Sequence, residues 1–126
     1  MMLFTSAYAV LIALQGACVP YAPQVVDLKG TLVREVRYGP PNYGENPKTD
    51  KRMRIWVLKL SQPISMCSDP TGSALEGIRE VQVFFKQAPT TLRGRVVHAR
   101  GTVEQATLGP QLTPVVMYVQ RVTRDP

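Results

Sequence analysis

Tyrosines and basic residues gather around one stretch of the chain, residues 38–54, and such a mixture could bind an anion. Aromatic rings can stack on bases or sugars, and guanidinium groups clamp carboxylates and phosphates. The positive charge would equally suit an acidic surface of another protein. The alternative interpretation is a rigid surface loop that only packs on the end of its domain. The candidate binding residues are Arg37, Tyr38, Tyr43, Lys48, Lys51, Arg52 and Arg54, together with Gln111 in the turn at 107–114.

The types and spacing of the residues do not indicate a catalytic site. His98 is the single histidine, and a catalytic imidazole needs an orienting carboxylate and a nucleophile. Glu80 and Glu104 could approach it only across strands. The nine acidic residues are scattered singly, which disfavours the paired carboxylates of a glycosidase. The sequence contains no phosphate loop, dinucleotide fingerprint or metal-ligand spacing, so we expect no enzyme activity, cofactor or metal.

Two cysteines, Cys18 and Cys67, are the remaining reactive groups. In an oxidising compartment they are expected to form one disulfide, which would join the start of the domain to the end of its second strand. Lipidation of Cys18 and two free thiols remain as alternatives. The usual lipidation motif has Leu three residues before the cysteine, whereas Leu14 lies four residues before Cys18.

The first seventeen residues predict export. Residues 7–14 form an uncharged apolar run that is too short to span a bilayer but fits the hydrophobic region of a secretory signal peptide. The run is not preceded by Lys or Arg, and Gln15 is a poor residue before a cut after Ala17. A cytosolic chain with a buried first helix is therefore the alternative. We expect a periplasmic or secreted domain, residues 18–126, with no transmembrane segment after removal of the leader.

The formal charge of +6 lies wholly after residue 17. A basic surface suits nucleic acid, anionic lipid or an acidic protein, or it is simply a solvated surface. Export makes nucleic acid an unlikely partner, because few nucleic acids are encountered outside the cytoplasm. The charge therefore favours a protein or another anionic ligand.

Five segments alternate apolar and polar residues with the period of two that is typical of β-strands. Nine glycines and eleven prolines indicate turns rather than helices. Gly30 and Gly101 lie in mid-strand, where glycine marks a sharp bend of a small barrel. We expect an all-β fold, a small five-stranded OB-like barrel with a long loop between strands 1 and 2, and a β-sandwich is the alternative. The segments are residues 25–36, 53–60, 79–86, 95–105 and 115–122.

Aromatic residues within these segments have different expected roles. Trp56 shares a strand face with Leu58 and should lie in the core. Phe84 and Tyr118 fall on the less apolar faces of their strands, so we expect the N-terminal segment or residues 67–77 to cover them. Otherwise they would extend a groove. Residues 67–77 themselves predict a turn followed by at most one helical turn.

Taken together, several stretches resemble a family of small exported domains of Gram-negative bacteria whose function is unknown. The most specific are the Gly-Pro-Pro-Asn-Tyr run at 39–43 and the spacing of the two cysteines, and the Thr-Pro-Val run at 113–115 also agrees. In that family the turn before Thr-Pro-Val is often rich in histidine, whereas residues 109–112 here are Gly-Pro-Gln-Leu. The resemblance covers nearly all of residues 18–126. It implies export, an OB-like barrel and a disulfide, and it implies no reaction.

We therefore expect a non-enzymatic periplasmic binding protein that holds another envelope protein, in the manner of an inhibitor or immunity protein. The loop at 38–54 and the turn at 107–114 would form the contact. The alternative function is a binding module for an anionic glycan, a lipid headgroup or an oligonucleotide.

Overall fold

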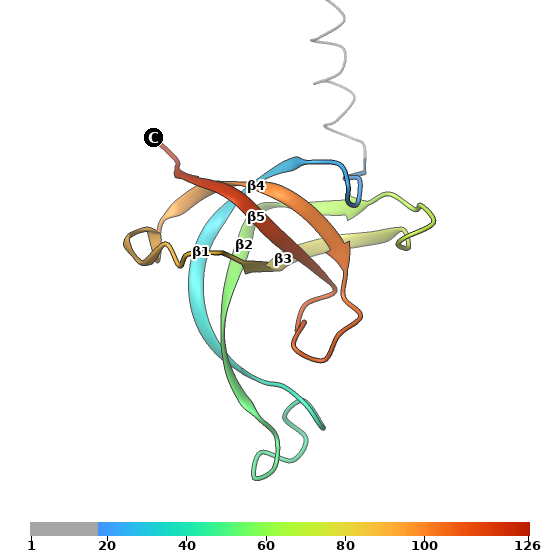
Figure 1. Cartoon of the computed structure of the whole chain (residues 1–126), viewed down its shortest axis with the longest axis vertical. Helices are drawn as coiled ribbons and strands as arrows, with labels where there is room; N and C mark the ends of the chain where they lie inside the picture. Colours follow the sequence, from blue (N-terminus) through green and yellow to red (C-terminus); the bar gives the residue numbers. More distant parts are fainter. Residues whose placement is uncertain (1–17) are drawn as a thin grey trace, which may run out of the picture.

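The computed structural model describes residues 18–126, and the predicted signal peptide at 1–17 lies outside the described residues. No helix in residues 18–126 is long and apolar enough to cross a bilayer. Five strands and one short 3₁₀ helix, η1, form the described part (Figure 1). They are β1 (Val26–Tyr38), β2 (Arg52–Met66), β3 (Leu75–Phe84), η1 (Thr90–Leu92), β4 (Val96–Gln105) and β5 (Val115–Arg124).

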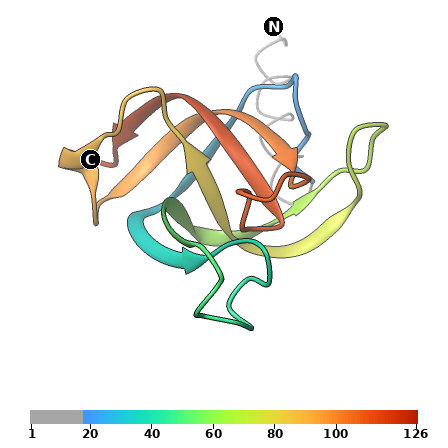
Figure 2. The same cartoon turned by 60° about the horizontal axis from the view of Figure 1, so that its bottom comes forward.

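The five strands close into one barrel in the order β1-β2-β3-β5-β4. Neighbouring strands are antiparallel except β3 and β5, which run parallel over a short stretch. Since β1 pairs with both β2 and β4, the sheet curls back on itself, as two views of the molecule show (Figures 1 and 2). The predicted OB-like barrel with a long loop between strands 1 and 2 is confirmed, and the sandwich alternative is wrong.

Gly30 and Gly101 lie where two strands pass too close for a side chain. A Cβ atom on Gly30 would collide with the carbonyl oxygen of Lys59, and one on Gly101 with the carbonyl oxygen of Tyr118. The register of β4 against β5 also shifts between Arg100 and Gly101. Such a bulge bends β4 locally, and the absence of a side chain at both glycines lets the strands approach closely, as the curvature of a small barrel requires.

Alternate residues of every strand fill the barrel interior. Trp56 is 9% exposed and belongs to this core, as expected. Its ring meets that of Phe85 edge to face, with 5.9 Å between the centroids. The interior also contains Leu28, Leu32, Leu58, Val81, Val83, Val97, Ala99, Val103, Val115 and Met117.

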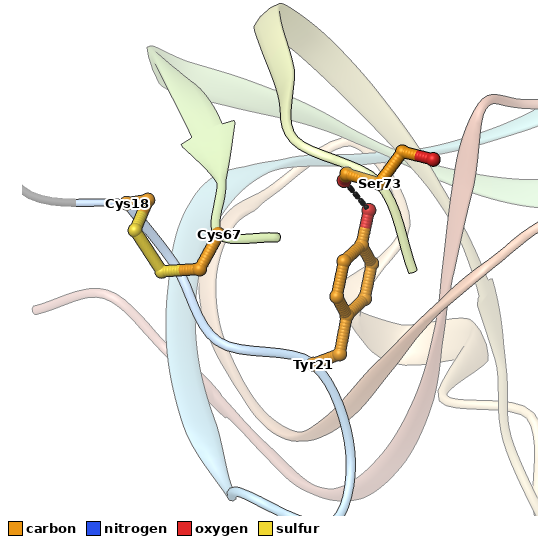
Figure 3. Close-up of a disulfide and its surroundings, with 4 residues drawn as sticks. All are labelled: Cys18, Tyr21, Cys67 and Ser73. Carbon is orange, nitrogen blue, oxygen red and sulfur yellow. Dashed lines mark hydrogen bonds between the residues drawn. A yellow bond between two sulfur atoms is a disulfide. The ribbon is translucent and has the colours of Figure 1, made fainter. Parts of the chain in front are cut away.

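A disulfide fastens the N-terminal segment across one end of the barrel. Cys18 is bonded to Cys67, directly after β2, and their Cα atoms lie 4.8 Å apart (Figure 3). The predicted disulfide is confirmed. Because the Cys18 sulfur is used in this bond, the alternatives that left it free or attached to a lipid do not fit the structure.

Tyr21 closes the same end of the barrel. Its side chain is 1% exposed, and its hydroxyl donates a hydrogen bond of 2.7 Å to the carbonyl oxygen of Ser73 (Figure 3). The backbone N–H of Val19 donates to the carbonyl oxygen of Ser65 at 2.7 Å, and that of Cys67 donates to Val19 at 2.9 Å. The disulfide therefore anchors a short segment whose tyrosine seals the core.

The hairpin of β2 and β3 differs from its prediction. β2 continues six residues beyond the predicted end at Leu60, and β3 begins at Leu75, inside the predicted connection at 67–77. That connection contains turns but no helical turn. The pairing of β2 with β3 shifts register after Lys59, so the period of two breaks there and the pattern underestimates both strands. The bounds of β1, β4 and β5 differ from prediction by two residues or fewer.

Replacing both Cys18 and Cys67 with Ser should lower the free energy of unfolding by about 4 kcal/mol. The bond joins residues 49 positions apart, so its loss restores the conformational entropy of a long loop to the unfolded chain. Guanidinium denaturation measures the difference. Tyr21→Phe, which keeps the disulfide and removes the hydrogen bond to Ser73, should cost only about 1 kcal/mol. A double-serine variant as stable as the oxidised protein would contradict the assignment.

Gly101→Ala should destabilise the barrel by about 3 kcal/mol, because the new methyl group meets backbone that cannot move aside. Gly94→Ala is the matched control. Its φ is +79°, but nothing lies within 4 Å of the added atom, so only backbone strain of about 1 kcal/mol is expected. Thermal unfolding of both variants measures the two losses. Equal losses of stability in the two variants would show that the close approach of Tyr118 to Gly101 does not exclude a side chain.

Candidate functional site

The loop between β1 and β2, residues 39–51, is folded around one carboxylate. Asp50 is 5% exposed and accepts hydrogen bonds from the backbone N–H groups of Asn42 (2.8 Å), Gly44 (2.8 Å) and Asn46 (3.0 Å). Desolvation opposes the charge, but the three donors lower the pKa of Asp50 below its ordinary value. The loop is thus held in one conformation by its own contacts.

Three predicted binding residues lie exposed on this loop. Tyr43 is 55% exposed, and Lys48 and Lys51 are also exposed. The backbone of Lys51 closes the loop, since its carbonyl oxygen accepts from the N–H of Gly39 at 2.7 Å and its N–H donates to Pro40 at 2.9 Å. The loop therefore presents these side chains from an ordered backbone at the far end of the β1–β2 hairpin (Figures 1 and 2).

Arg37, another predicted binding residue, is engaged in an internal ion cluster on the outer face of β1, β2 and β3. Its guanidinium donates two hydrogen bonds of 2.8 Å to Glu80 and one of 2.9 Å to Glu35. Lys59 lies 2.7 Å from Glu80 and 3.1 Å from Glu35. The hydrogen bond from Arg37 outweighs partial desolvation and, with Lys59, holds the pKa of Glu80 at about 2. Two cations and two anions thus neutralise one another.

Gln111 is also used within the chain. Its Oε1 accepts from the backbone N–H groups of Thr107 (2.6 Å) and Leu108 (2.8 Å), and its Nε2 donates to the hydroxyl of Tyr118 at 3.1 Å. Tyr118 stacks on Phe84 with 5.3 Å between ring centroids, and it remains 38% exposed. The side chain that contacts Tyr118 thus comes from the loop between β4 and β5, not from the N-terminal segment or residues 67–77 as expected, and Phe84 lines a cavity, as the groove alternative held. The side chain of Gln111 therefore stabilises the loop between β4 and β5, and both of its polar atoms already have partners within the chain.

The β4–β5 loop fills the outer face of β3 at Gln82, which is 2% exposed. Its Oε1 accepts from the N–H of Leu112 at 2.6 Å, and its Nε2 donates to the carbonyl oxygen of Pro110 at 3.1 Å. The N–H of Gln82 donates to the hydroxyl of Thr113 at 2.9 Å. OB-folds bind oligonucleotides on the face of strands 2 and 3, and in this chain protein already occupies much of that face.

Beyond the barrel, β1 and β2 continue as a two-stranded arm, residues 34–38 paired with 52–56, which curves away from the barrel (Figure 1). Cross-strand partners and alternate residues of a strand lie on the same face. One face of the arm is therefore basic and apolar, with Val36 47% and Tyr38 36% exposed. This basic face of the arm consists of Arg34, Val36, Tyr38, Arg52, Arg54 and Trp56.

At the base of the arm, two adjoining cavities of about 320 and 290 Å³ share Arg34, Arg54, Trp56 and Ala88, and the smaller one also includes Arg93. The described residues that line them include no acid. Within residues 18–126, none of Arg34, Arg54 and Arg93 forms an ion pair with an acidic side chain. We call this site, the three arginines around Trp56, the arginine cleft.

Two contacts position the arginines of the cleft. The guanidinium carbon of Arg34 lies 5.0 Å from the ring centroid of Trp56, which holds this side chain over the aromatic face. The carbonyl oxygen of Leu32 accepts from the N–H of Gly94 at 2.7 Å, so the segment that carries Arg93 lies beside β1. The cations are therefore brought together by strand pairing and by one stacked contact.

The structure divides the predicted site residues into three groups. Arg54, Arg52 and Tyr38 lie on the basic face of the arm, while Tyr43, Lys48 and Lys51 lie on the loop at its end, and Arg37 and Gln111 make internal contacts. Sequence reasoning missed Arg34 and Arg93. Arg34 had a detectable signal, because it occupies the strand face that Leu28 and Leu32 bury. Arg93 lies in a connection without a pattern.

His98 has a different partner from those considered in the sequence. Its Nε2 lies 2.6 Å from a carboxylate oxygen of Asp125, rather than near Glu80 or Glu104, and Lys29 approaches Asp125 at 3.9 Å. This contact fastens the C-terminal residues to β4. Among residues 18–126 there is no cluster of three or more His, Cys, Asp or Glu side chains that could hold a metal ion.

Comparisons with known proteins return no match. No protein-family model, curated protein or solved structure matches the chain. The resemblance carried by residues 39–43 and the cysteine spacing is therefore not confirmed as family membership, although the barrel and the disulfide agree with the fold that it implies.

The ion cluster predicts a pH dependence of stability. A carboxylate with a lowered pKa contributes stability above its unfolded pKa and loses it as the pH falls through its folded pKa. For Glu80 this window runs from about pH 4.5 down to about pH 2. Glu80→Gln should be less stable than the wild type at pH 7, and the difference should shrink across that window in urea denaturation. Glu104→Gln, at an exposed position outside the cluster, is the control, and a pH-independent difference for Glu80→Gln would contradict the ion cluster.

Proposed function

We propose that the chain is a non-enzymatic binding protein of the cell envelope, which holds an acidic protein partner in the arginine cleft and along the basic face of the arm. The observation that carries the proposal is that Arg34 and Arg54 line two adjoining cavities, and Arg93 the smaller of them, without an acidic residue in either lining. Like charges brought together without a counterion are costly, and an acidic partner removes that cost. Guanidinium groups bind carboxylates with two parallel hydrogen bonds.

The composition of the surface favours a protein over a polyanion. Exposed Val36 and Tyr38 lie between the arginines, and interfaces between proteins are enriched in Tyr and Arg. Trp56 is 9% exposed, so its ring offers little surface on which a base or sugar could stack. A module for an anionic glycan, a lipid headgroup or an oligonucleotide is supported by the net charge of +6 and by the arginines, but not by the exposed apolar residues between them.

The shape of the arm suits a blocking role of the inhibitor or immunity type. It projects from the barrel and ends in a loop that Asp50 holds in place (Figure 1). A loop that is already ordered loses little conformational entropy when it enters a cleft of its partner. The disulfide suits an oxidising compartment and therefore agrees with export.

A photo-crosslinking amino acid at Val36 tests the proposal in intact cells that produce the protein. We expect one defined envelope protein to be trapped, because Val36 is exposed within the basic face. Arg54→Glu should reduce the cross-linked yield at least tenfold, since charge reversal in the cleft repels an acidic partner. Arg79→Glu, which reverses an exposed arginine outside the cleft, is the matched control and should leave the yield unchanged.

Two outcomes would contradict the proposal. Equal loss of yield in Arg54→Glu and Arg79→Glu would show that overall charge, not the cleft, attracts the partner. The absence of a defined cross-linked protein, together with heparin retention that falls steeply with salt, would favour the polyanion-binding alternative.

A further inference from the structure

At its N-terminal end, β2 extends beyond the part that pairs with β3. Its pairing with β1 is unbroken from Leu60 to Arg52, whereas its pairing with β3 begins only at Trp56, opposite Val83. In the described chain, residues 52–55 therefore pair with β1 along one edge and have no strand along the other. Their backbone groups also make none of the turn and loop hydrogen bonds found elsewhere in residues 18–126. An open strand edge of about 13 Å results.

This open edge borders the larger cavity of the arginine cleft. Met53, Arg54 and Ile55 line the cavity from β2, and Phe84 and Phe85 line it from the diverging end of β3. The cavity thus lies in the angle where two paired strands separate. An open edge in such an angle is a template for a further strand.

The two sides of the cleft differ in chemistry, because successive residues of a strand face opposite ways. Arg54 lies on the side of Arg34, while Met53 and Ile55 lie on the opposite side. A strand added to the edge would alternate in the same way. One set of its side chains would face the arginines, and the other would face the side that carries Met53, Phe84 and Pro110, beside the nearly buried Ile55 and Gln82.

We propose that the acidic partner enters the cleft as an extended segment, which adds a strand to the open edge of β2 at residues 52–55. The segment alternates Asp or Glu with apolar residues. Its acids pair with the arginine side, its apolar residues pack on the opposite side, and its backbone hydrogen bonds to β2. This inference rests on the proposed function and specifies how the partner is recognised.

A second copy of the chain fits the edge less well. Pairing two β2 edges would bring the arginines of both copies together, and like charges on adjacent strands are destabilising. The acidic segment of another protein has the complementary charge. Sedimentation of the protein without ligand should therefore show a monomer, and a dimer that protects the backbone amides of residues 52–55 from hydrogen exchange would overturn the inference.

The direct test uses a synthetic heptapeptide, acetylated and amidated, in which four Glu alternate with three Val. It is titrated into the oxidised protein, purified as the cell processes it, while the backbone amide signals of residues 53–55 are followed by NMR. We expect those signals to move and the dissociation constant to lie below about 1 mM. A peptide of the same composition with its four Glu in one block is the matched control and should bind at least tenfold more weakly.

N-methylation separates strand addition from simple charge attraction. Alternate residues of an added strand direct their N–H groups to the edge, and the other residues direct theirs away. Two peptides are made, one methylated on the Val nitrogens and one on the two central Glu nitrogens. One of them should bind at least tenfold more weakly than the parent, and the other should bind about as tightly.

The possible failures are distinguishable. If both methylated peptides bind like the parent, or the blocked peptide binds equally well, charge alone holds the ligand. The strand inference is then overturned and the proposed function stands. If the parent peptide does not bind at 1 mM, the strand inference is also overturned, and the cross-linking at Val36 decides the proposed function independently.

Discussion

The structure depends on one constraint: toward Tyr38 and Arg52, the pairing of β1 with β2 continues beyond the pairing of either strand with its other neighbour. β1 leaves β4 after Thr31, and β2 joins β3 only at Trp56, yet β1 and β2 stay paired as far as Tyr38 and Arg52. The strand face that buries Leu28 and Leu32 inside the barrel therefore continues outside it. Beyond the barrel that face can carry arginine, because no core has to be filled there.

The charged residues on the two faces of the β1–β2 hairpin differ in whether they have partners of opposite charge. On the outer face, Glu35 and Glu80 pair with Arg37 and Lys59, so their charges cancel locally. On the other face Arg34 and Arg54 line the cleft with Arg93 from the β3–β4 connection, and no acid of the described part of the chain lines it. Three of the fifteen basic residues of the sequence thus lie together at the cleft, and their positive charge has a defined place and direction. A directed positive surface selects a partner and its orientation, whereas a uniformly basic protein attracts any polyanion.

The sequence predicts those features that depend on the residue types within one short stretch of the chain. Gly30 and Gly101 predict bends because glycine in mid-strand is typical of sharp curvature, and the disulfide follows from two cysteines in a domain expected to be exported to an oxidising compartment. The sequence does not predict features that depend on contacts between segments far apart in the chain. The register shifts in β2 and β3 hide the ends of that hairpin. Arg93 reaches the cleft only because a connection lies beside Leu32, and the role of Asp50 depends on three backbone amides that no pattern reveals.

We propose that Arg34, Arg54 and Arg93, which form no ion pair within residues 18–126, are covered by a partner in the cell. Arginine-selective labelling with phenylglyoxal, read by mass spectrometry, compares the protein in cells with the purified protein directly. We expect the three arginines to react in the purified protein and to be protected in intact cells, while exposed Arg79 reacts in both. Equal reactivity of the three in cells and in the purified protein would contradict it.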